Sequence, residues 1–200
     1  VALITFIILM FGQTGILPDP MMASTLIVWI FAMRVMMIVT SAVAYWINNA
    51  ISKVRFGNKE RFDFEQPLTS LVWITSIISI IVTFIVSYLL IGNIEGGLWW
   101  KLSFIISLGT IAAAIIPELT KAFTSSSSRH VKEVVNASRE GGASLTILSG
   151  MVAGNFSAFW KGLVMMGLMA AGFFIVQDMT LFGEYPAIFA FGLIAFGFLG

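Results

Sequence analysis

Long apolar runs alternate with short polar segments along this chain of 200 residues. The runs show no period-two alternation of polar and apolar residues, and four of them exceed the roughly 20 residues that a helix needs to cross a bilayer. Since lipid satisfies no backbone hydrogen bonds, such runs form helices or closed barrels, and their length favours helices. The pattern predicts an all-α, polytopic transmembrane helical bundle with spans at approximately 1–11, 21–51, 68–91, 98–123, 144–176 and 186–200.

The first and last runs are too short to cross a bilayer, so we expect four complete and two truncated spans. The chain begins Val-Ala-Leu without an initiator methionine. The first run also lacks the basic region and the small-residue cleavage site of a signal peptide. We therefore expect residues 1–200 to be one membrane domain fragment of a longer protein.

The charges of the connecting segments predict a topology. Segments 52–67 and 120–142 carry four Lys or Arg residues each, whereas the other three carry acidic residues and no base. The positive-inside rule places 52–67 and 120–142 in the cytoplasm, and the other three segments then face outward, as alternate crossings require. We expect an integral, multi-pass protein, of the cell membrane if the source is a prokaryote.

Composition narrows the function classes. Hydrophobic residues make up 58% of the chain and charged residues 10%, with a net charge of +1 and no cysteine. This balance gives no basic field for nucleic acid, and the absence of cysteine excludes disulfides, thiolate metal sites and a cysteine nucleophile. There is also no phosphate-binding P-loop motif and no His cluster or Asp-rich run for metal ions.

Two runs are longer than a bilayer needs. The run 21–51 would extend about 46 Å as a helix, and 144–176 is similar. The cytoplasmic end of the second of these is polar, so we expect both helices to protrude into the cytoplasm. The charged stretch VKEVVNASRE, 131–140, predicts a short solvated helix that ends at Gly141 and Gly142.

Two charged residues are candidates for an intramembrane role. Arg34 lies about 20 Å along its helix, near mid-membrane, where a charge is costly. It is either an ion-pathway residue or a structural partner of an acid outside these spans. Glu118 follows Pro117, which should bend the helix, and it is spaced to pair with Lys121. Glu118 and Lys121 read either as an interfacial pair with a snorkelling lysine or as functional groups.

Three further features have both a structural and a functional reading. Small residues recur every fourth position and form a helix-packing stripe, for a contact within or between subunits, at Gly150, Gly154, Ala158 and Gly162. His130 is the sole histidine, and a lone loop histidine is more often solvated than catalytic. The serine run 125–128 fits caps and turns, or an anion site. The residues alone therefore indicate a fragment of an α-helical transporter or channel.

Two stretches of sequence resemble a known family. FGNKERFDFEQPLTSLVWITSIISI (56–80) and IPELTKAFTSSSSRHVKEVVNASREGGASLTILSGMVAGNFSAFW (116–160) are similar to loops and helices of membrane-bound ion-translocating pyrophosphatases. SREGGASLTILSGMVAGN is the most specific part. The tail PAIFAFGLIAFGFLG is similar to the run that precedes one of the substrate-binding helices in that family.

The resemblance implies a pump that hydrolyses inorganic pyrophosphate and moves H⁺ or Na⁺ outward. It implies a homodimer of sixteen-helix subunits, in which an inner ring of six helices holds the pyrophosphate and Mg²⁺ sites. K⁺ is a possible further cofactor. This fragment would be mostly outer-ring scaffold, inactive alone, because it contains none of the aspartate motifs of the family. No catalytic or metal-binding residue is therefore carried over. The rival reading is a segment of a non-enzymatic secondary transporter, with Arg34 as a substrate or coupling residue.

Overall fold

The structure, a computed structural model, describes residues 1–12, 15–17, 19–57, 65–94, 97–179, 182 and 185–199. Lys59 and Arg61 of the basic segment 52–67, and the acids Glu95 and Glu184, lie outside the described residues. The regular elements of the described part are six α-helices, and the prediction of an all-α fold is confirmed. They are α1 (Ala2–Phe11), α2 (Pro20–Phe56), α3 (Glu65–Ile91), α4 (Leu98–Thr124), α5 (Arg129–Val176) and α6 (Pro186–Phe198).

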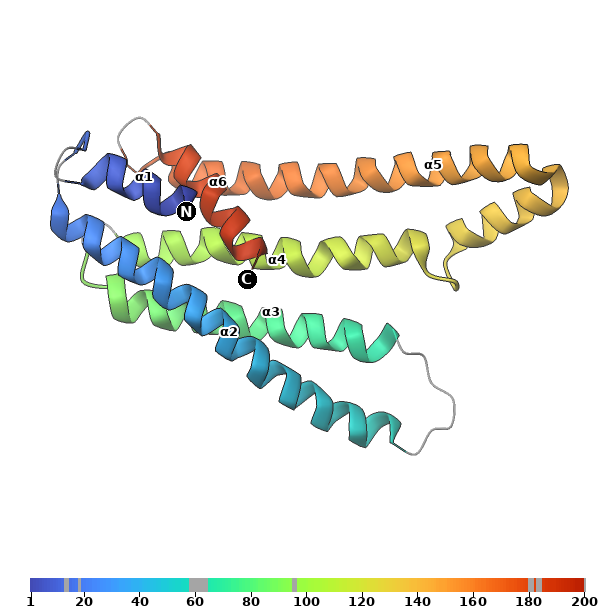
Figure 1. The fold of residues 1–200 in the computed structure, drawn as a ribbon, viewed down its shortest axis with the longest axis horizontal. Helices are drawn as coiled ribbons and strands as arrows, with labels where there is room; N and C mark the ends of the chain where they lie inside the picture. The colour runs from blue at the N-terminus through green and yellow to red at the C-terminus, as the bar shows by residue number, and fades with distance from the viewer. Residues whose placement is uncertain are drawn as a thin grey trace.

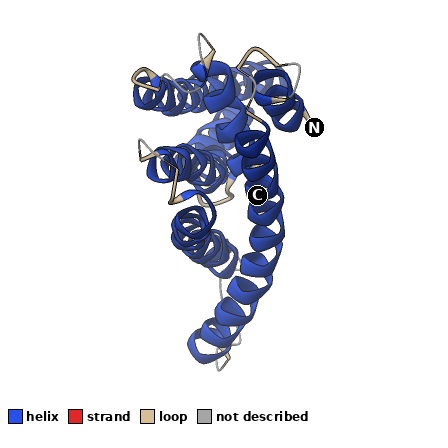
Figure 2. Ribbon diagram, turned by 90° about the vertical axis from the view of Figure 1, so that its left-hand side faces the viewer, coloured by secondary structure: helices blue, strands red, loops and turns tan. Residues whose placement is uncertain are grey.

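Helices that follow one another in the chain pack side by side. α2 packs on α3, α3 on α4 and α4 on α5 along the long axis of the molecule (Figure 1). α6 crosses α4, and α1 lies beside the start of α6 and against α2. Viewed from the end, several helices are seen nearly along their axes, and a long helix runs obliquely beside them (Figure 2). The end of α2, the start of α3 and the end of α4 lie at one end of the molecule (Figure 1).

The outer faces of the helices are apolar. Ile77, Ile81 and Ile85 recur every fourth residue along α3 and are exposed. The helical stretches long and apolar enough to cross a membrane are 20–56, 65–91 and 98–176, the last containing both α4 and α5. Apolar residues on the outside of a bundle are what lipid contact favours, because lipid gives no hydrophobic drive to bury them. The chain is thus part of a multi-pass integral membrane protein.

Hydroxyl groups join the helices inside the bundle. The Trp29 indole N–H of α2 donates to the Ser87 hydroxyl of α3 over 2.9 Å, in a buried contact. The Thr40 and Ser79 hydroxyls of the same two helices lie 3.3 Å apart. Because these groups have no water to bond in an apolar interior, such pairs specify how the helices face one another.

Glycines let α4 and α6 approach until their backbones touch. A Cβ added at Gly109 would lie 2.1 Å from the Ile194 carbonyl oxygen, and one at Gly197 would lie 2.2 Å from the Ile106 oxygen. Neither position therefore has room for a side chain. This reciprocal contact fixes where α6 crosses α4.

α5 is two helical segments joined by a sharp reversal. Gly141 and Gly142 have non-helical backbone angles, and Gly142 has φ 61° and ψ −147°. The segment 129–140 therefore folds back against the long segment that follows (Figure 1). The expected short helix thus occupies most of the segment 120–142, and we call 129–156 the α5 hairpin.

Candidate functional site at the ends of α3 and α4

The first turn of α3 meets the last turn of α4 across a polar cluster. Glu65 lies in the first turn of α3, and Lys121 lies in the last turn of α4. An acid at a helix N-terminus and a base at a C-terminus each complement the helix dipole. The local sequence therefore favours each residue where it stands, before any contact between them is considered.

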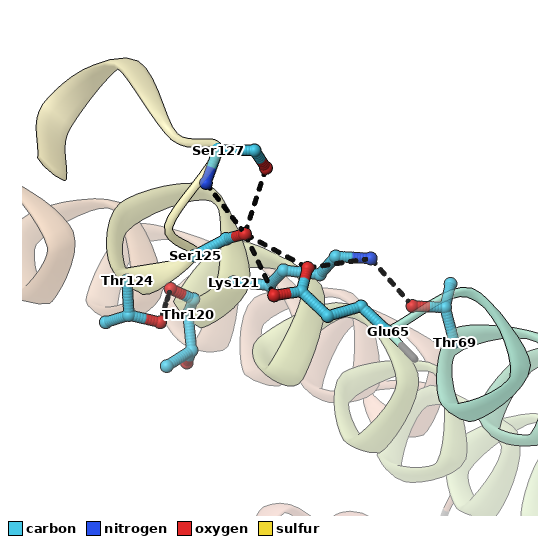
Figure 3. Close-up of polar contacts among 7 residues, drawn as sticks. All are labelled: Glu65, Thr69, Thr120, Lys121, Thr124, Ser125 and Ser127. Atoms are coloured by element: carbon cyan, nitrogen blue, oxygen red, sulfur yellow. Dashed lines mark hydrogen bonds and ion pairs between the residues drawn. The ribbon is translucent and has the colours of Figure 1, made fainter. Parts of the chain in front are cut away.

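Lys121 lies at the centre of this cluster. Its ammonium donates to the Thr69 hydroxyl over 2.9 Å and lies 3.8 Å from a carboxylate oxygen of Glu65 (Figure 3). The Ser125 hydroxyl donates to the same carboxylate at 2.9 and 3.0 Å. The ion pair is partly exposed, at 34% for Lys121 and 38% for Glu65, so it stabilises by about 1 kcal/mol or less. The cluster therefore joins the two helix ends only weakly.

A cavity of about 710 Å³ opens beside the cluster. We call it the α3–α4 groove, and its lining residues are Glu65, Leu68, Thr69, Val72, Ile116, Pro117, Glu118, Thr120, Lys121, Thr124, Ser125 and Ser126. Residues at the helix ends supply its polar part, and residues one to two turns further along supply its apolar part. Its volume is in the range of sites that bind small molecules.

Glu118 is half-buried and lines this groove. The expected pairing with Lys121 is replaced by the contact of Lys121 with Glu65, which comes from another helix. Within the described part of the chain, Glu118 makes no ion pair. The local spacing was compatible with a pair, but the rotation of α4 against α3 directs the lysine toward α3.

Arg34 lies on the exposed side of α2. Its guanidinium donates to the Leu199 carbonyl oxygen at the end of α6 over 3.0 Å. It also lines a cavity of about 400 Å³ between α1, α2 and α6, whose other lining residues are apolar. Among the described residues no acid pairs with it.

The small-residue stripe lies on an open face of α5. Gly150, Gly154, Ala158 and Gly162 are exposed, and a Cβ at any of the three glycines would meet no atom within 4 Å. Within the described part of the chain, no helix covers this stripe.

His130 joins the end of α4 to the α5 hairpin. Its ring stacks on Phe123 with centroids 4.5 Å apart, and the Phe156 ring lies 6.1 Å away. Its Nδ1 lies 3.7 Å from the Glu133 carboxylate. The histidine is half-buried, and its contacts hold the fold of the hairpin.

Sequence analysis missed Glu65, Thr69 and the glycine crossing. The signal for Glu65 was an acid directly before an apolar run, which is a helix-start pattern. The signal for Gly109 was the small-residue composition of its helix, with Ser103 and Ser107 nearby. Neither signal indicates which residue of another helix Glu65 or Gly109 would contact.

The described residues differ from the ligand set that metal-assisted phosphoryl transfer needs. Among them, no group of three His, Cys, Asp or Glu side chains is placed to hold a metal ion. Metal-assisted phosphoryl transfer needs several such oxygen ligands.

The whole chain is similar in sequence to known proteins. The family model for inorganic H⁺ pyrophosphatase matches residues 1–200. The chain is 53% identical, over its full length, to a K⁺-insensitive pyrophosphate-energized proton pump of Chlorobaculum tepidum, of which it covers 26%. It is 29% identical over 126 residues, or 62% of the chain, to a putative K⁺-stimulated pyrophosphate-energized sodium pump of Clostridium tetani, of which it covers 18%. No solved structure gives a significant match.

Proposed function

This chain belongs to the inorganic H⁺ pyrophosphatase family, and on that premise we propose that the complete protein hydrolyses inorganic pyrophosphate and pumps an ion outward across the membrane. The observation that carries the proposal is 53% identity over the whole chain to a pyrophosphate-energized proton pump. Because the chain spans about a quarter of that relative, the activity belongs to the complete protein. The 200 residues would serve mainly as scaffold.

Of the two ions, H⁺ is the one we propose. The relative that matches the full chain is named as a K⁺-insensitive proton pump, whereas the sodium pump matches 62% of the chain at lower identity. We accordingly propose that added K⁺ has little effect on the rate. Na⁺ coupling is the alternative within the same family.

Mg²⁺ is the proposed cofactor for the pyrophosphate substrate. The residues described here do not fit such a site, because no three potential ligands converge among them. Glu65 is already paired with Lys121 and Ser125. We therefore place the Mg²⁺ and pyrophosphate ligands outside the described residues and derive no hydrolytic step from them.

We also propose how this part is oriented and what it contacts. The end that carries Lys121 and the α5 hairpin faces the cytoplasm, in keeping with the basic residues of 120–142. The protein is a homodimer, and the exposed stripe from Gly150 to Gly162 packs against a helix outside the described residues. Arg34 pairs with an acid on a helix outside this chain segment. Its side chain is exposed and can therefore contact such a helix.

The test is pyrophosphate hydrolysis by the complete protein in sealed membrane vesicles with Mg²⁺. We expect phosphate release together with acidification of the vesicle interior in inside-out vesicles, with no requirement for Na⁺ or K⁺. Hydrolysis that requires Na⁺ and drives Na⁺ uptake would overturn the choice of ion. No hydrolysis by well-folded protein would overturn the enzyme proposal and favour a secondary transporter.

A further inference from the structure

We draw no further inference here: the strongest candidate, the cavity of about 330 Å³ that the buried Ser76 and other hydroxyl-bearing residues of α2, α3 and α4 line, adjoins the α3–α4 groove at Val72, and nothing in the structure shows whether water, lipid or another helix covers it.

Discussion

Replacing Gly142 with alanine should open the α5 hairpin. Gly142 has φ 61° and ψ −147°, a combination that is open essentially to glycine alone. A Cβ there would meet no atom within 4 Å, so the cost comes from the backbone and not from a clash. Such strain costs about 1–3 kcal/mol. The hairpin contacts that oppose it are few and half-exposed, among them the stacking of His130 on Phe123.

Gly167→Ala is the matched control. Gly167 lies in the long segment of α5, away from the reversal, and its backbone is helical. A Cβ added there would meet no atom within 4 Å, as at Gly142. Gly167→Ala therefore makes the same chemical change without the backbone strain and should cost much less than Gly142→Ala.

Amide hydrogen exchange of the segment 129–140 in the complete protein measures the difference. A local loss of about 2 kcal/mol raises exchange by about 30-fold if the segment exchanges through local opening. We expect that increase in Gly142→Ala and no increase in Gly167→Ala. Equal exchange in the two variants would refute the argument that the Gly142 backbone angles decide the reversal.

Three other tests concern the packing of the helices and the charge of Arg34. Gly109→Ala places a Cβ 2.1 Å from a backbone oxygen of α6 and should lower the free energy of unfolding by about 1–3 kcal/mol. The thermal midpoint in detergent should fall accordingly, whereas Gly167→Ala, whose Cβ meets no atom within 4 Å, should leave it unchanged. A double-mutant cycle of unfolding should give a coupling free energy of about 0.6 kcal/mol between Trp29→Phe and Ser87→Ala. A coupling free energy of zero would contradict the hydrogen bond. Arg34→Met should reduce the yield of folded protein and leave the specific pumping rate intact if Arg34 is a structural partner, while a lower rate in normally expressed protein would place it on the ion path.

Much of the helical architecture was predictable from local pattern. The long apolar runs and the charge alternation of the connecting segments depend on residues close together in the chain. The end of the short helix at Gly141 and Gly142 was also predictable, because two adjacent glycines after a charged helical stretch are a local signal, but the reversal of the chain there was not predicted. Local signals suffice here because a helix makes its backbone hydrogen bonds between residues one turn apart. A sufficiently long apolar run is also stable in a bilayer without any particular partner.

The partners of individual side chains were not predictable in this way. Lys121 was spaced to pair with Glu118 on its own helix, yet it contacts Glu65, 56 residues earlier (121 − 65). The choice depends on how far α4 is rotated against α3, and that rotation is set by packing along the whole length of both helices. The groove lining follows from the same rotation.

The sequence by itself determined that this chain forms long membrane helices, and which family it resembles. Only the tertiary structure decided that Gly109 and Gly197 touch, that the stripe from Gly150 to Gly162 stays uncovered within the described chain, and that Lys121 turns to α3. The physical reason is range. Helix formation is a local hydrogen-bonding and solvation problem, whereas contacts between helices depend on rotation and crossing angle, which no short segment specifies.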